Sequence, residues 1–153
     1  MTRVFLSLGS NLGDREAQLQ EALRRLDAAG GVAIVQRSSI RETEPQDLVD
    51  QPKFLNIAAE AVTDLSAVDL LARIHAIEAD MGRVRTVPKG PRTIDIDILF
   101  YGDVVIETPE LQIPHPRLAA RRFVLEPLAE IAPDLRHPVM GLTICELLAA
   151  SAS

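Results

Sequence analysis

Two aspartates, Asp95 and Asp97, are the residues of this sequence best suited to chemistry. They alternate with Ile94, Ile96 and Ile98, and the side chains of a strand alternate between its two faces. We therefore expect the isoleucines in a core and the carboxylates on the other face, roughly 7 Å apart at their backbones. Such a pair suits two divalent ions held about 3.5–4 Å apart, as in sites that handle phosphates. The alternative is that the aspartates are only the solvated face of a half-buried strand.

Basic residues just upstream favour the phosphate interpretation. Arg83, Arg85, Lys89 and Arg92 lie close together, although the chain has 22 acidic and only 16 basic residues. Prolines and a glycine interrupt this segment, so we expect a loop. Guanidinium groups beside carboxylate-bound magnesium neutralise a phosphoryl group during its transfer. The alternative is a network of salt bridges between these arginines and the aspartates.

Length and composition limit the function classes. A chain of 153 residues is most simply one domain over residues 1–153, and we expect a monomer. It has no apolar run near the roughly 20 residues of a membrane span and no secretory leader, so we expect a cytoplasmic protein without membrane contact. The net charge of −6 argues against nucleic-acid binding. The single cysteine, Cys145, excludes an internal disulfide.

The apolar periodicity predicts the elements that must hold these residues. In chain order they are a strand at 3–8, a helix at 13–29, strands at 32–40 and 54–62, a helix at 66–81 and the strand that carries the aspartates. This order, β-α-β-β-α-β, predicts an α+β fold of the ferredoxin-like kind, with two helices on one face of a mostly antiparallel sheet.

Turns and caps complete the predicted fold. We expect Asn11 or Asp14 to cap the first helix and Ser66 the second. The glycine-containing run 9–14 lacks the Gly-Lys-Ser/Thr ending of a P-loop, so we expect a tight turn there. A polar loop should cover 41–53. A short hairpin within 103–113 and extra C-terminal helices within 118–129 and 142–150 should follow the last strand of the sheet.

Two histidines and a nearby arginine are candidates for the same site. His75 and Glu78 share a face of the second helix, offset from its apolar stripe, and the alternative is an ordinary exposed helix surface. His115 stands between two prolines, which hold it in a stiff, extended segment. A structural role for His115 is the alternative. Arg121 lies close behind and adds to the suspected anion site.

Phe54, Asn56 and Phe123 could hold a flat heterocycle. Aromatic stacking combined with amide hydrogen bonds is a common way to bind such a ring, and Asn56 can read both a donor and an acceptor on one ring edge. The alternative is that both phenylalanines belong to the core.

Together these segments resemble the 6-hydroxymethyl-7,8-dihydropterin pyrophosphokinase family, which transfers diphosphate from ATP to a pterin alcohol in folate biosynthesis. The resemblance covers nearly the whole chain. It rests on Gly9-Ser10-Asn11-Leu12, Gln51-Pro52 to Phe54-Leu55-Asn56, Glu78 to Arg85, Gly90-Pro91-Arg92-Thr93-Ile94-Asp95-Ile96-Asp97-Ile98, and Pro114-His115-Pro116 to Phe123.

The resemblance implies a role for each candidate and agrees with the ferredoxin-like fold. It implies that Asp95 and Asp97 bind two Mg²⁺ ions and, with Arg83 and Arg92, form the catalytic group. The implied ATP contacts are His75, Glu78, Arg85, Ile98, His115 and Arg121. The implied pterin contacts are Thr43, Phe54, Asn56 and Phe123.

This chain departs from the family pattern at three places. Pro88 and Lys89 stand where well-known members have an arginine and a tryptophan, Glu44 replaces a frequent proline, and Pro116 replaces an aromatic residue of some members. Two other functions are therefore weighed: a catalytically weakened member that only binds nucleotide, and an RNA-binding sheet. The second needs exposed aromatic residues and a basic face, and the composition does not favour it.

Overall fold

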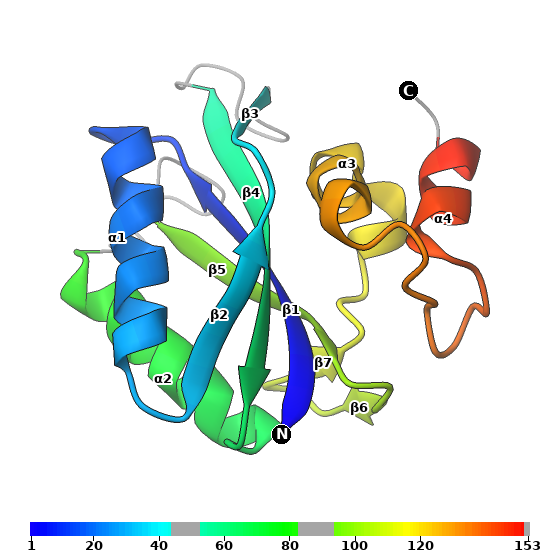
Figure 1. Ribbon diagram of the computed structural model, residues 1–153, viewed down its shortest axis with the longest axis horizontal. Coiled ribbons are helices and arrows are strands. Elements are labelled where there is room, and N and C mark those ends of the chain that lie inside the picture. The colour runs from blue at the N-terminus through cyan, green and yellow to red at the C-terminus, as the bar shows by residue number, and fades with distance from the viewer. Residues whose placement is uncertain (44–52, 83–93, 152–153) are drawn as a thin grey trace.

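A computed structural model describes residues 1–43, 53–82 and 94–151. Its main sheet has the order β2-β4-β1-β5, and all neighbouring strands are antiparallel (Figure 1). The short strand β3 also pairs with β4. The strands are β1, Thr2–Ser10; β2, Val32–Arg37; β3, Arg41–Thr43; β4, Phe54–Thr63; and β5, Asp95–Tyr101.

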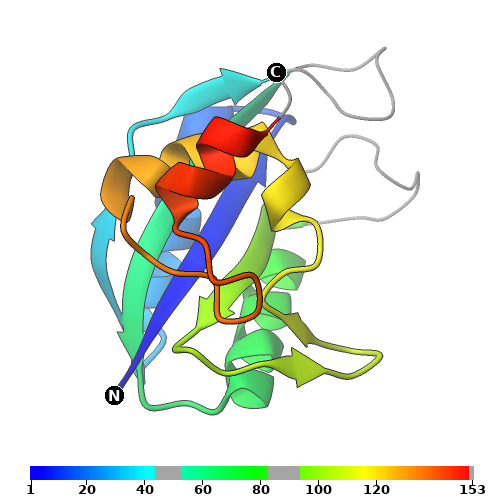
Figure 2. The same cartoon turned by 90° about the vertical axis from the view of Figure 1, so that its right-hand side faces the viewer.

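Helices cover both faces of this sheet (Figures 1 and 2). Helices α1 and α2 lie on one face, and α3, α4 and a short 3₁₀ helix, η1, lie on the other. A hairpin of β6 and β7 connects β5 to η1. The bounds are α1, Arg15–Ala28; α2, Ala67–Asp80; β6, Ile106–Glu107; β7, Gln112–Ile113; η1, Leu118–Ala120; α3, Arg122–Ile131; and α4, Ile144–Ala150.

Alternating side chains divide the interior into two hydrophobic cores. On β1, Leu6 and Leu8 pack into the core under α1 and α2. Phe5, on the other face, packs with Phe100 of β5 and with residues of α3 and α4. Helices and an antiparallel sheet that pack in this way confirm the α+β class, and the expected hairpin and C-terminal helices are present.

Both long helices begin where the sequence predicts. The side chain of Asp14 accepts a hydrogen bond from the N–H of Ala17 at 3.1 Å, and Ser66 accepts one from the N–H of Asp69 at 3.1 Å. These caps satisfy N–H groups that have no partner within the helix. Of the two caps considered for α1, the structure therefore selects Asp14 rather than Asn11.

Three predicted boundaries are wrong. β1 does not stop at Leu8 but continues to Ser10, because Gly9 pairs with β4 on one side and β5 on the other. β2 ends at Arg37 instead of Ile40, after a register shift against β4. The polar stretch that follows begins as a strand, β3, rather than as a loop.

No helix within the described ranges is long and apolar enough to cross a membrane.

Candidate active site

The two faces of β5 are as different as the spacing of its aspartates predicts. Ile94 just before the strand, and Ile96 and Ile98 within it, are only 0%, 4% and 5% exposed and belong to the core under α2. Asp95 and Asp97 are partly exposed, and in the antiparallel register they lie opposite Gly9 and Ser7 of β1. Both carboxylates therefore project from the face opposite the isoleucine core.

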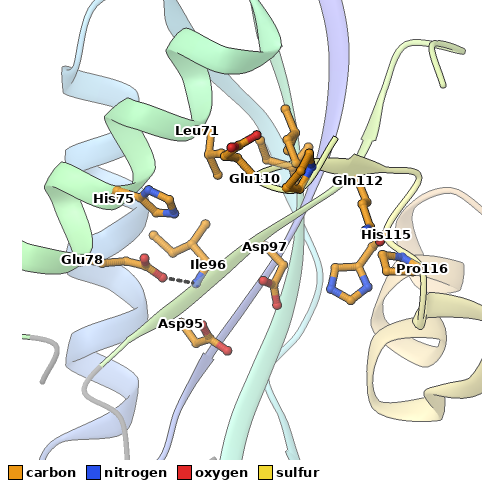
Figure 3. Close-up of a pocket in the computed structure, with 13 residues that line it drawn as sticks. Leu71, His75, Glu78, Asp95, Ile96, Asp97, Glu110, Gln112, His115 and Pro116 are labelled. Atoms are coloured by element: carbon orange, nitrogen blue, oxygen red, sulfur yellow. Dashed lines mark hydrogen bonds between the residues drawn. The ribbon is translucent and has the colours of Figure 1, made fainter. Parts of the chain in front are cut away.

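A pocket of about 260 Å³ surrounds the outer edge of β5 (Figure 3). It lies between α2, the β6-β7 hairpin and the segment that carries His115. Predicted residues that line it are His75, Glu78, Asp95, Asp97, Ile98 and His115. The structure thus brings together the described residues assigned to metal and most of those assigned to ATP.

Glu78 lies on the α2 side of this pocket and is almost fully buried. It is 4% exposed, and its carboxylate accepts a hydrogen bond from the backbone N–H of Ile96 at 2.9 Å (Figure 3). β5 is an edge strand, so this N–H points away from β1 and needs a partner outside the sheet. The alternative that Glu78 is exposed helix surface is wrong, whereas His75 is exposed at the rim.

His115 lies across the pocket from Glu78, and Asp97 lies between the two in the view of Figure 3. Its backbone N–H donates to the carbonyl of Leu99 in β5 at 3.1 Å. Its Nδ1 accepts a hydrogen bond from the backbone N–H of Arg117 at 3.2 Å, so in the neutral ring the proton is on Nε2. The rigid segment therefore fixes both the position and the tautomer of this imidazole.

The surroundings of His115 keep it uncharged. Burial is the main cause that lowers its pKa to about 4, and the positive charges of Arg121 and Arg117 act in the same direction. The carboxylate of Asp95 opposes them by raising the pKa. At neutral pH His115 is consequently a neutral hydrogen-bond donor at Nε2.

Arg121 lies near this pocket without lining it. Its guanidinium is 5.4 Å from the centre of the Phe123 ring, which is a cation–π distance. Phe123 is half-buried and packs against the core under α3 and α4. Arg121 is thus close both to the histidine and to one of the predicted ring-stacking residues.

The other predicted ring contacts gather at the ends of β3 and β4. The Asn56 side chain, only 3% exposed, donates a hydrogen bond from Nδ2 to the Thr43 hydroxyl at 2.5 Å. A Cβ at Gly9 would lie 2.8 Å from Asn56 Oδ1 and 3.6 Å from the half-buried Phe54 ring. Gly9 is therefore needed for the close approach of β1 to this polar pair.

Several predictions fall outside the described residues. Arg83, Arg85, Lys89 and Arg92 all lie within 83–93, and Glu44 lies within 44–52. Within the described ranges, no group of three or more histidine, cysteine or acidic side chains could hold a metal ion. Two carboxylates are nevertheless a normal protein contribution to a Mg²⁺ site, because substrate phosphates and water supply the other ligands.

The hairpin supplies pocket residues that the sequence analysis missed. Glu110, Leu111 and Gln112 line the pocket with Pro109. These residues come just before the segment with His115. The hairpin expected at 103–113 was therefore the one feature of the sequence that could have pointed to them. Its packing against β5 depends on the strand order, which no local pattern reveals.

A family model for 7,8-dihydro-6-hydroxymethylpterin-pyrophosphokinase (HPPK) matches residues 5–133 of this chain. The chain belongs to the HPPK family. The resemblance seen in the sequence is thereby confirmed, and the family name supports pyrophosphokinase activity.

Named relatives agree with the HPPK assignment. The chain is 44% identical over 97% of its length to the 2-amino-4-hydroxy-6-hydroxymethyldihydropteridine pyrophosphokinase of Pseudomonas aeruginosa, and covers 91% of that protein. It is 47% identical to the Bacillus subtilis protein of the same name over 83% of this chain and 76% of that one. With the folic acid synthesis protein fol1 of Schizosaccharomyces pombe it shares 46% identity over 94% of its length, but it spans only 20% of that relative.

Solved HPPK-DHPS structures share the fold. A Plasmodium falciparum HPPK-DHPS structure superposes with a TM-score of 0.78 at 18% identity, covering 97% of this chain and 42% of the other. At this identity the likeness supports the fold alone. The chain therefore spans less than half of that two-part protein.

Proposed function

We propose that this chain transfers diphosphate from ATP to the hydroxymethyl group of 6-hydroxymethyl-7,8-dihydropterin and releases AMP. The observation that carries the proposal is the register that sets Asp95, Gly9 and Asn56 in one row across β5, β1 and β4. Because this row joins the pocket beside β5 to the polar pair on β3 and β4, two substrates can meet over Gly9.

Asp95 and Asp97 fit Mg²⁺, and we propose that they hold two ions together with ATP. Their carboxylate oxygens are the hard ligands that Mg²⁺ prefers, and both project from one face of a strand fixed by its isoleucines. When bound, Mg²⁺ would neutralise phosphate charge and lower the pKa of the attacking hydroxyl.

The pocket residues are proposed to bind the nucleotide. His115 would donate a hydrogen bond from its Nε2–H to a phosphate oxygen. Its pKa of about 4 keeps the ring neutral, so His115 would add no charge at neutral pH. Arg121, close to His115, would balance phosphate charge, and His75 and Ile98 would contact the part of ATP nearer α2. Glu78 would act by holding the backbone of Ile96. We assign further charge stabilisation to Arg83, Arg85 and Arg92 on the resemblance alone.

The pterin is proposed to bind over β4. Asn56, oriented by its bond to Thr43, can accept and donate on one ring edge. Phe54 and Phe123, both half-buried, offer aromatic faces for stacking. A buried amide rejects a ring that cannot match its hydrogen bonds, because the mismatch leaves polar groups unpaired.

The proposed step is an in-line displacement at the β-phosphorus. The hydroxymethyl oxygen forms a bond to that phosphorus, the bond from the phosphorus to the α,β-bridging oxygen breaks, and AMP leaves with that oxygen. The hydroxyl proton passes to water. Positioning and charge stabilisation would supply the catalysis.

We infer a ferredoxin-like arrangement, supported by the antiparallel order β2-β4-β1-β5 and by two helices on one face. We also propose one pyrophosphokinase domain over residues 1–153, since both cores share one sheet. We further propose a cytoplasmic monomer without membrane partners, and the net charge of −6 argues against nucleic-acid partners.

Product analysis tests the reaction. With ATP, Mg²⁺ and the pterin alcohol, we expect AMP and pterin diphosphate in equal amounts. The matched control is the 6-methyl pterin, which has the same ring but no hydroxyl, and it should give no AMP above slow hydrolysis. Release of ADP would contradict diphosphate transfer. Nucleotide binding without any pterin-dependent AMP would identify a catalytically weakened member.

A further inference from the structure

A second pocket, of about 230 Å³, adjoins the first. It lies between the β6-β7 hairpin and the loop that connects α3 to α4, which approach each other in Figure 2. Its walls are mainly apolar and include Val105, Ile106, Ile113, Val139 and Met140. Val105 and Met140 at its edge are 48% and 49% exposed, so apolar surface continues to its mouth.

His137 is the buried polar side chain in these apolar walls. It is 8% exposed, and its Nδ1 accepts hydrogen bonds from the backbone N–H groups of Val139 at 3.2 Å and Met140 at 3.1 Å. Its ring packs edge-on to Phe100, with the ring centres 5.7 Å apart. Burial lowers the pKa of His137, so the ring is neutral and its proton is on Nε2. Among the described residues, no acceptor is recorded for that N–H.

We propose that this second pocket binds a neutral, flat aryl or heteroaryl molecule that presents one hydrogen-bond acceptor to His137 Nε2. The volume lies between the about 150 Å³ that encloses benzene and the about 300 Å³ of the smallest drug-sized sites, which fits one or two rings. Glu107 also lines the pocket, and its negative charge disfavours an anion. This donor provides specificity, because an occupant without an acceptor would exclude water from the N–H and leave it unpaired.

This site is coupled to the nucleotide pocket through a shared wall. Gln112, His115 and Pro116 line both pockets. An occupant of the second pocket therefore packs against the segment that presents His115 to the first. Any effect of the occupant on nucleotide affinity must be matched by an equal effect of nucleotide on the occupant.

Quinoline and naphthalene form a matched pair of probes for the donor. They have the same shape, but only quinoline carries a ring nitrogen that accepts a hydrogen bond. The chain has three methionines, so ¹³C-methyl methionine spectra would report binding at Met140, with Met1 and Met81 as internal references. We expect both probes to shift Met140 and quinoline to bind about threefold to tenfold more tightly, the range of one neutral hydrogen bond.

Two variants test separately the hydrogen-bond donor of His137 and the volume of the second pocket. His137→Asn keeps an acceptor for the turn at Val139 but cannot place a donor at the Nε2 position, so quinoline should lose its advantage over naphthalene. Ala119→Leu fills the pocket from η1 and should weaken both probes at least tenfold. Three results would each overturn the site. They are a Met140 methyl signal that neither probe shifts, equal affinities of quinoline and naphthalene for the unchanged protein, and unchanged affinities of both probes for Ala119→Leu. None of these readouts needs turnover, so they stand apart from the proposed function.

A last titration tests the shared wall. We expect saturating Mg²⁺-ATP, without pterin, to change the quinoline affinity at Met140 by at least twofold. Quinoline should then change the ATP dissociation constant by the same factor. An unchanged affinity would contradict the coupling.

Discussion

The two faces of β5 differ in what their side chains meet. On one face Ile94, Ile96 and Ile98 are buried among residues of α1, α2 and the neighbouring strands. On the other, Asp95 and Asp97 lie opposite Gly9 and Ser7 of β1, a glycine and a residue with a small side chain. One strand therefore carries both a stabilising stripe, the isoleucines, and a reactive stripe, the aspartates. The two stripes alternate residue by residue along the chain but lie on opposite faces.

The reactive stripe lies where the second core ends. Phe5, Ala58 and Phe100 belong to the part of this face that is buried with α3 and α4. Toward the ends of β1 and β4 the same face carries Gly9 and Asn56 instead. The rigid strands beside the second core therefore carry the polar residues to which we assign ligand contacts. Substitutions on the two faces of β5 should accordingly change different measurements.

Asp97→Ala should give the largest effect. Loss of a carboxylate that binds metal removes several kcal/mol of transition-state stabilisation, so kcat should fall at least about a thousandfold. The residue is partly exposed, and the melting temperature should change little. Steady-state kinetics and thermal unfolding measure the two quantities. Near-normal turnover in Mg²⁺ would contradict the metal assignment, and Asp97→Asn separates the loss of charge from the loss of shape.

Ile94→Ala is the opposite case on the stabilising face. Ile94 is fully buried, and truncating it should lower the free energy of unfolding by about 2–5 kcal/mol through lost burial and a cavity. Denaturant unfolding measures this loss, and Ile94→Val should cost only about 0.5–1.5 kcal/mol. Activity per folded molecule should fall far less than in Asp97→Ala. An equal loss of kcat in Ile94→Ala would show that the two faces are not independent.

Local spacing predicts the part of the site that a strand or helix builds alone. The alternation of aspartates with isoleucines, and the caps at Asp14 and Ser66, follow from a few adjacent residues, and the structure agrees with them. The pairing of Asn56 with Thr43 depends on β3, which lies in a stretch that the sequence predicts as a loop. A strand of three residues gives no periodic signal and is stabilised by its neighbour.

Contacts between elements that are distant in the chain could not be predicted from the sequence, for a different reason. The bond from Ile96 to Glu78 exists only because β5 is the edge strand nearest α2. The second pocket likewise depends on where the loop after α3 meets the hairpin. Strand order and loop packing are long-range properties, and the residue types involved look ordinary along the chain.

Glu78→Leu should lower both the stability of the protein and its affinity for Mg²⁺-ATP, because Glu78 holds the backbone of β5 between the two aspartates. The substitution leaves the buried N–H of Ile96 without its acceptor, which costs about 1–3 kcal/mol in the free energy of unfolding. Glu78→Gln keeps an acceptor oxygen and should cost less than about 1 kcal/mol. Because Ile96 lies between the aspartates, the Leu variant should also bind Mg²⁺-ATP less tightly than the Gln variant. Calorimetric titration compares them, and equal affinities would contradict a positioning role for the hydrogen bond.

The smallest expected effect is the pH dependence that His115 contributes. Its pKa of about 4 in the folded protein lies below the 6.5 of an unperturbed histidine, mainly because of burial and also because of Arg121 and Arg117, with Asp95 acting against them. The unfolded chain then binds a proton more readily than the folded one. The contribution of His115 to stability is therefore complete above about pH 6.5 and declines as the pH falls toward 4. Denaturant unfolding without Mg²⁺ should show that the unchanged protein loses more stability between these limits than His115→Gln, with His137 giving the same background in both. A greater loss in His115→Gln would mean that folding raises the pKa of this histidine and that it is charged in the site.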